Sequence, residues 1–309
     1  MRVLSTRRFP GPAWERLGDV EVIEWPPARA YDDAHVVAVV AARVDGPILD
    51  LLPRLRLVAN YGVGYDAIDV VECARRGIAV THTPEALGIA TAELTIALVL
   101  AVRRRIVEGD RFVRDGKWAA GWIVGQLLGD EVRGATLGVV GLGRIGRAVA
   151  DRARAFGMNV IYTRRSMERD DGYRDLDDLL READVVTLHA PLTDETCGMI
   201  DTRRLALLRD GAALINTSRG AIVDEAALVH ELESGRIRAG LDVFVDEPNV
   251  PPPLFDLPNV VLLPHVGSAT RATREAATVE LVDNIEAVLS GHEPPNLVPG
   301  SATVSQTAP

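Results

Sequence analysis

The fold of this chain is constrained most by a regular alternation of short β-branched runs with helical or turn-rich segments. Such alternation is typical of βαβ units, in which successive strands pair in parallel. A long helical segment from about Gly88 to Arg105 interrupts the pattern, which then restarts. The pattern therefore predicts an α/β fold with two doubly wound parallel sheets. The runs before the interruption are RVLST, EVIEW, VVAVV, LRLVAN and IAVTHT, and those after it are TLGVVG, NVIYT, VVTLH, AALIN, AGLDV and VVLLPH.

The length of 309 residues also favours two domains, because a typical domain has roughly 150 residues. The last helical pattern, from about Arg271 to Leu289, can return the chain to the first lobe. We therefore expect residues 1–92 and 268–309 to form one domain and residues 93–267 the other, with a cleft between them.

The composition is that of an ordinary soluble globular protein, with 47% hydrophobic and 25% charged residues. A net charge of −10 argues against nucleic acid as a partner, because binding to its phosphates needs a basic patch. An anionic ligand would have to bind where arginines or helix N-termini make the surface locally positive.

Features of targeting, membrane insertion and metal binding are missing from the sequence. Its N-terminus lacks the apolar core of a signal peptide, and its most apolar stretch, TIALVLAV (95–102), is too short to span a membrane. The two cysteines, Cys73 and Cys197, lack metal-ligand spacing and are expected to be reduced. We therefore expect a cytoplasmic protein with a buried helix at 95–102, no membrane contact and no metal.

The sharpest local motif is GLGRIG, with Gly141, Gly143 and Gly146. It directly follows the apolar strand TLGVV and opens a helical run, which is the setting that a dinucleotide site requires. The glycines permit a tight turn, close approach of the pyrophosphate and helix packing. The simpler alternative is a tight strand-to-helix turn without a ligand.

The next strand, NVIYT, ends in Arg164, Arg165 and Ser166, where an NAD enzyme would place an acidic residue on the ribose 2′-hydroxyl. Two guanidiniums and a hydroxyl instead favour a 2′-phosphate through charge-assisted hydrogen bonds. The segment therefore predicts a preference for NADP(H) over NAD(H). The alternative is a solvated basic loop.

Three further segments, NTSRG (216–220), AGLDVFVDEP (239–248) and LPNVVLLPHVGSAT (257–270), lie at the ends of predicted strands. Together with GVGYDAID (62–69), GLGRIG and LHAPLTDET (188–196), they resemble the D-isomer-specific 2-hydroxyacid dehydrogenase family, in the family's order and over nearly the whole chain. The resemblance implies a Rossmann coenzyme domain and a flavodoxin-like substrate domain. It also implies hydride transfer between a nicotinamide cofactor and a small 2-keto acid/D-2-hydroxy acid pair.

The family's catalytic triad corresponds to Arg219, Glu247 and His265 in this sequence. Hydride delivery to a keto carbon leaves negative charge on its oxygen, so a general acid and a positive group are needed. Histidine suits the acid role, because an imidazole titrates near pH ~6.5. A neighbouring carboxylate favours the imidazolium and fixes the ring. Arg219 presents a planar fork for the substrate carboxylate or carbonyl.

Two alternatives for these roles are set aside. Asp246 is not chosen as the carboxylate, because the family's carboxylate directly precedes the proline, here Pro248. The remaining histidines have no comparable partners in sequence, and none of them is assigned to catalysis: His35, His82, His189, His230 and His292.

The resemblance implies further contacts. Backbone N–H groups of Val63 and Gly64 would bind the substrate carboxylate, together with Arg219 and His265. Cofactor contacts would come from Gly141, Gly143, Arg144, Ile145, Gly146, Arg164, Arg165, Ser166, His189, Pro191, Thr196, Thr217, Ser218, Asp242 and Gly267, with Asp242 orienting the nicotinamide carboxamide.

The segment KWAAGWIVGQLLG (117–129) resembles an arm that reaches a partner subunit in relatives. It predicts a homodimer. Trp122 falls where hydroxypyruvate-reducing relatives place a tryptophan at the neighbour's substrate site, and the alternative is an aromatic anchor of the interface.

Within the family, the basic NVIYTRRS segment and Trp122 favour a glyoxylate/hydroxypyruvate reductase. A D-3-phosphoglycerate dehydrogenase-like enzyme is the alternative enzyme. A nucleotide-sensing corepressor, which would bind the cofactor without appreciable turnover, is the alternative from another class.

Overall fold

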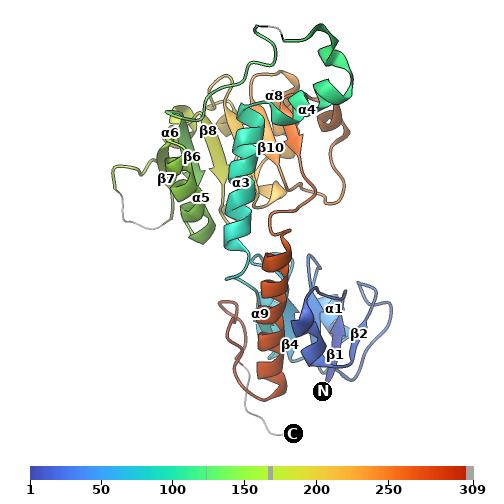
Figure 1. The fold of residues 1–309 in the computed structure, drawn as a ribbon. Coiled ribbons are helices and arrows are strands. Elements are labelled where there is room, and N and C mark those ends of the chain that lie inside the picture. The colour runs from blue at the N-terminus through green and yellow to red at the C-terminus, as the bar shows by residue number, and fades with distance from the viewer. Residues whose placement is uncertain (123, 166–169, 304–309) are drawn as a thin grey trace. The chain divides into compact units, whose positions relative to one another are not determined.

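The computed structural model describes residues 1–122, 124–165 and 170–303. The chain divides into two compact units (Figure 1): the first comprises Met1–Leu87 and Ser268–Pro309, and the second comprises Gly88–Gly267. The division falls between Leu87 and Gly88 rather than after residue 92. The reason is that helix α3 (Gly88–Arg103) lies against Arg144 and Ile145 of the second unit from its first residue onward.

The first unit contains a five-stranded, wholly parallel sheet in the order β2-β1-β3-β4-β5. This order is that of flavodoxin-like doubly wound sheets. The strands are β1 (Arg2–Ser5), β2 (Val20–Val22), β3 (Ala34–Val39), β4 (Leu57–Asn60) and β5 (Ala79–Thr81). The helices are η1 (Pro12–Leu17), α1 (Gly46–Asp50), α2 (Val70–Arg75) and α9 (Arg271–Leu289).

Side chains of β3 alternate between the two faces of this sheet, as the pleat of a strand requires. Val36 and Ala38 pack on one face with Leu281 and Ile285 of α9, so the C-terminal helix does return to the first unit. Val37 and Val39 pack on the other face, beside apolar residues of α1 and α2. The sheet is therefore covered on both faces.

The second unit contains a six-stranded, wholly parallel sheet in the order β11-β10-β9-β8-β6-β7. An isolated parallel bridge between Tyr162 and Tyr173 lies beyond β7, where the usual Rossmann order has one more strand. The strands are β6 (Thr136–Val140), β7 (Asn159–Thr163), β8 (Val185–Leu188), β9 (Ala213–Asn216), β10 (Arg238–Leu241) and β11 (Val260–Leu262). The remaining helices are α4 (Ile106–Arg114), η2 (Lys117–Ala120), α5 (Arg144–Ala155), α6 (Leu176–Glu182), α7 (Thr202–Leu205), η3 (Gly220–Ile222), α8 (Glu225–Glu233) and η4 (Pro252–Asp256).

Helices α3 and α5 lie side by side on one face of the second sheet (Figure 1) and share an apolar core with it. Leucines of α6, α7 and α8 form a core on the opposite face. The prediction of two doubly wound parallel sheets is therefore confirmed. The apolar run 95–102 lies in α3, with Ile96, Leu98 and Val99 buried. No helix in the described ranges has the length and apolar character needed to cross a membrane.

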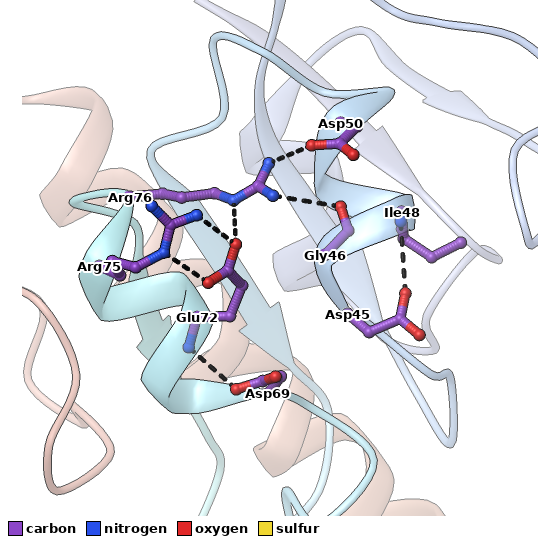
Figure 2. A network of polar contacts seen from close by, with 8 residues as sticks. All are labelled: Asp45, Gly46, Ile48, Asp50, Asp69, Glu72, Arg75 and Arg76. Carbon is purple, nitrogen blue, oxygen red and sulfur yellow. Dashed lines mark hydrogen bonds and ion pairs between the residues drawn. The ribbon is translucent and has the colours of Figure 1, made fainter.

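An ion-pair network joins α1 to α2 in the first unit (Figure 2). The Glu72 carboxylate accepts hydrogen bonds from Arg75 and Arg76, and Arg76 also donates to Asp50 and to the carbonyl of Gly46. These two guanidiniums lower the pKa of Glu72 to about 2. The network therefore connects the two helices on this face of the first unit by charge as well as by packing.

Candidate active site

The GLGRIG turn joins β6 to α5 and has the geometry of a phosphate site. A Cβ at Gly146 would lie 2.1 Å from the Gly141 carbonyl oxygen, and one at Gly141 would lie 2.8 Å from the backbone of His189 and Ala190. A Cβ at Gly143, the N-cap of α5, would meet no atom within 4 Å. The first turn of α5, which starts with Arg144 and Ile145, is thus open and has no side-chain cap. A helix N-terminus of this kind fits a pyrophosphate.

His189 lies beside this turn, at the carboxyl end of β8. Its Nε2 atom is buried and has no hydrogen-bond partner in the described part of the chain. Burial lowers the pKa of the imidazole to about 4, so the ring is neutral at pH 7. An orphaned polar atom next to an open helix N-terminus supports the fit of a polar ligand here.

Two arginines follow β7 directly. The guanidinium of Arg164 lies over the ring of Tyr162, with 5.5 Å between Cζ and the ring centroid. Arg165 is exposed, and its Nη1 lies 3.5 Å from Oε2 of Glu195. An exposed ion pair of this kind contributes little, so Arg165 remains available to a ligand phosphate. Ser166, the third residue predicted for this contact, lies outside the described residues.

The other polar residues predicted for the cofactor lie at the carboxyl ends of β8 and β9. Thr196 donates from Oγ1 to the Pro191 carbonyl at 2.6 Å, which closes the turn after β8. The hydroxyls of Thr217 and Thr95 lie 2.9 Å apart. Ser218 donates to Asn216 Oδ1 at 3.0 Å. These contacts order both loops at the edge where parallel sheets bind ligands.

His265 and Glu247 form a direct pair, with 2.7 Å between Nδ1 and Oε2. A carboxylate only accepts, so Nδ1 carries the hydrogen and Nε2 is left for another partner. Burial raises the pKa of Glu247. Hydrogen bonds from His265 and from the Phe244 N–H outweigh this effect, and the net pKa is lowered. Glu247 is therefore ionised at neutral pH and oriented by two donors.

Asp242 shapes the turn that presents His265. The backbone of His265 is left-handed, with φ of 53°, which costs a non-glycine residue about 1–3 kcal/mol. The Asp242 carbonyl accepts from the His265 N–H at 2.9 Å. Its buried carboxylate accepts from the N–H groups of Val266 at 2.7 Å and Gly267 at 2.8 Å. Asp242 thus holds three successive N–H groups and offsets the strain at His265.

Arg219 lies in the loop after β9, next to the Glu247 segment. A Cβ at Gly220 would lie 2.1 Å from the carbonyl carbon of Phe244, so only glycine permits this approach of the two backbones. Asn216 donates to the Arg219 carbonyl at 2.8 Å and orders the same loop. The positive charge of Arg219 contributes to the lowered pKa of Glu247. The fold of the second unit therefore brings Arg219, Glu247 and His265 into one charged group.

Each unit carries one further element predicted to bind substrate. In the first unit, Val63 and Gly64 lie in the loop after β4, and both are at least partly exposed. In the second unit, Trp122 follows η2 and is 82% exposed. It lines a shallow groove with Phe112, Val113, Trp118 and Leu127.

Comparisons with known proteins bear on this site. Residues 96–267 match the model of the "D-isomer specific 2-hydroxyacid dehydrogenase, NAD binding domain" family. The chain belongs to this family. A glyoxylate reductase of Thermococcus litoralis is 49% identical over 85% of this chain and 82% of its own length. One of Thermococcus kodakarensis is 45% identical over 96% of both chains.

A solved structure extends the comparison to three dimensions. It is the NADPH-dependent glyoxylate/hydroxypyruvate reductase of Sinorhizobium meliloti in complex with NADP and malonate. It is 36% identical, with a TM-score of 0.90 over 99% of both chains. As a D-2-hydroxyacid dehydrogenase family member, the present chain is an oxidoreductase with a two-unit α/β fold.

Sequence reasoning missed two features of this dehydrogenase site. Asp242 was assigned to the nicotinamide alone, whereas its carboxylate also builds the turn of His265. Asn216 is not singled out by the sequence analysis, although asparagine at a strand end often accepts a hydrogen bond from the backbone two residues on, here from the N–H of Ser218.

Proposed function

We propose that this chain reduces glyoxylate and closely related small 2-keto acids, such as hydroxypyruvate, to the 2-hydroxy acids. The observation that carries the proposal is the 2.7 Å pair of His265 and Glu247, which the Asp242 turn holds in place beside the charge of Arg219. Reduction of a keto acid needs three groups: a proton donor, a carboxylate that stabilises the charged form of that donor, and a guanidinium. The names of the similar enzymes support the choice of glyoxylate.

In the proposed mechanism, His265 donates the proton from Nε2 to the keto oxygen, because Nδ1 is committed to Glu247. Glu247 stabilises the imidazolium and keeps the ring oriented. Arg219 binds the substrate and shares the negative charge on the oxygen. The N–H groups of Val63 and Gly64 bind the substrate carboxylate. A nicotinamide cofactor, when bound, would supply the hydride for the keto carbon, and His265 would supply the proton for the oxygen.

The proposed cofactor is NADPH in preference to NADH. The pyrophosphate would lie at the open N-terminus of α5, and Arg164 and Arg165 would bind the 2′-phosphate. Of the remaining residues assigned to the cofactor, Asp242 and Gly267 lie at the His265 turn. His189, Pro191, Thr196, Thr217 and Ser218 lie in the loops after β8 and β9.

The proposed assembly is a homodimer through the segment after α4. Four large apolar side chains are exposed there: Trp118 by 53%, Trp122 by 82%, Val124 by 81% and Leu128 by 69%. A cluster of this kind on a soluble protein marks an interface, and a two-fold dimer is the commonest way to bury it. Contact of Trp122 with the partner's substrate belongs to the same proposal.

A panel of 2-keto acids assayed with NADPH and NADH tests the proposed function. We expect the highest kcat/KM for glyoxylate or hydroxypyruvate, with NADPH as the better cofactor. Binding of NADPH without turnover of any keto acid would contradict the proposal and favour a binding protein.

A further inference from the structure

Two polar side chains of the first unit lie where the paired strands β4 and β5 end. Asn60 is the last residue of β4 and is 5% exposed, and His82 follows β5 directly. The two strands are parallel neighbours, so their carboxyl ends meet at one edge of the sheet. The loop with Val63 and Gly64 leaves the sheet at this edge.

Asn60 holds two carbonyl groups of that loop. Its Nδ2 donates to the Gly64 carbonyl at 2.9 Å and to the Gly62 carbonyl at 3.3 Å. Carbonyl oxygens only accept, so the amide nitrogen must face them, and both of its hydrogens are used. The Gly62 carbonyl also accepts from the Thr83 N–H at 2.9 Å.

His82 forms a hydrogen bond with the carbonyl of Val63, which lies between Gly62 and Gly64. Its Nδ1 lies 3.0 Å from the Val63 carbonyl oxygen, which requires a hydrogen on Nδ1. His82 is itself held by Asn284 of α9, which is fully buried. Asn284 donates from Nδ2 to the His82 carbonyl at 3.2 Å, and its Oδ1 accepts from the Asn296 N–H. A chain of hydrogen bonds therefore runs from the core of the unit to the loop.

The three carbonyl bonds determine where the N–H groups of the loop point. In a planar trans peptide, the C=O of one residue and the N–H of the next point in opposite directions. The peptide bonds of this loop are trans. The N–H of Val63 thus points away from Asn60, and the N–H of Gly64 points away from His82. Neither donates to any atom of the described residues.

We propose that Asn60 and His82 are positioning residues that keep the N–H groups of Val63 and Gly64 turned outward to receive the substrate carboxylate. The inference rests on the proposed function, because that function supplies the carboxylate. Outward N–H groups on a pre-ordered loop bind an anion without the entropy cost of ordering the loop on binding. A contact with the carboxylate exists in the bound substrate and in the transition state alike, so it acts on KM more than on kcat.

The test measures KM and kcat for glyoxylate in His82→Phe and Asn60→Ala, together with the inhibition constant of oxalate as a carboxylate probe. Loss of the side-chain hydrogen bonds to these carbonyls should raise KM and the inhibition constant on the order of tenfold, with kcat much less affected. The matched control is His35→Phe. Its Nδ1 also bonds to backbone, the Arg2 N–H at 3.3 Å, but at the amino end of β3. This control should leave KM unchanged.

Asn60→Asp provides a pH-dependent readout that a merely structural role would not produce. The ionised carboxyl would face two carbonyl oxygens and release the loop, whereas the protonated form can donate one hydrogen bond. The ratio of the variant's KM to that of the wild type should therefore fall as the pH is lowered. Asn159→Asp is the matched control, because Asn159 Nδ2 also donates to a glycine carbonyl, that of Gly134 at 3.0 Å.

The outcomes separate the two proposals. A wild-type protein that reduces no keto acid overturns the proposed function itself. A wild type that reduces glyoxylate, combined with variants that keep its KM and the oxalate constant, overturns the positioning role alone. If His82→Phe fails to fold, the pH series of Asn60→Asp decides, and a ratio independent of pH rejects the inference.

Discussion

His265 Nδ1 donates to Glu247 Oε2 across 2.7 Å, so the carboxylate charge lies directly against the ring. The pKa of Glu247 is lowered, and Glu247 is therefore ionised throughout the range in which an imidazole titrates. Reduction consumes a proton from the ring, and the charge of Glu247 stabilises the ring while it carries that proton.

Glu247→Gln should lower kcat/KM for glyoxylate on the order of tenfold, because glutamine keeps the acceptor but removes the charge that stabilises the ring while it carries the proton. The measurement is kcat/KM for glyoxylate at neutral pH. Asp246→Asn is the control, since Asp246 pairs with Asn249 instead. An unchanged kcat/KM in Glu247→Gln would show that the pair does not govern catalysis.

Replacement of Arg164 and Arg165 by alanine should raise KM for NADPH by about ten- to a hundredfold, because charge-assisted hydrogen bonds to the 2′-phosphate are lost. KM for NADH should stay nearly the same. Arg154→Ala is the control, because Arg154 pairs with Asp151 on α5 and lies near the C-terminal end of that helix. A wild-type enzyme that prefers NADH would contradict the assignment of these arginines to the 2′-phosphate.

Trp118→Ala combined with Trp122→Ala should weaken the dimer about tenfold or more, because buried aromatic residues dominate interface energies. Sedimentation velocity over a range of concentrations measures this change. Phe255→Ala, which removes an aromatic side chain that is 54% exposed on η4, should leave the dimer intact. A wild type that is monomeric at micromolar concentration would contradict the proposed interface.

Glu72→Gln should lower the melting temperature at pH 7, because it removes the carboxylate that pairs with Arg75 and Arg76 in the network between α1 and α2 (Figure 2). The folded-state pKa of Glu72 is about 2, below its ordinary value of 4.5. Its contribution is thus complete above the ordinary value and disappears as the pH falls through about 2. The difference in melting temperature should shrink over that window. Glu24→Gln changes an exposed carboxylate of the same unit that pairs with no cation among the described residues, and it should show no such window.

Much of the fold could be predicted because it depends on local patterns. Alternation of apolar runs with helical segments is visible in the sequence, and it determines both sheets. The position of the division is different, since it depends on which unit the first turn of α3 packs against. That packing is a tertiary contact between Gly88 and residues 144 and 145.

The site was predictable as residue types but not as geometry. Glycines, basic residues and the triad are recognised from their neighbours in sequence. The left-handed backbone of His265 and the three N–H groups held by Asp242 depend on hydrogen bonds between segments more than 20 residues apart. The sequence does not indicate a role for His82 for a similar reason. Its hydrogen-bond partners Val63 and Asn284 are both remote from it in sequence. The cytoplasmic location stays a prediction.

The central claim is that His265 acts as the general acid of a keto-acid reductase, and His265→Ala tests it most directly. The measurement is steady-state kinetics with glyoxylate and NADPH, paired with a fluorescence titration of NADPH binding. The account predicts a fall in kcat by a factor on the order of 10²–10⁴ with cofactor affinity nearly unchanged. A variant that keeps its kcat would contradict the account.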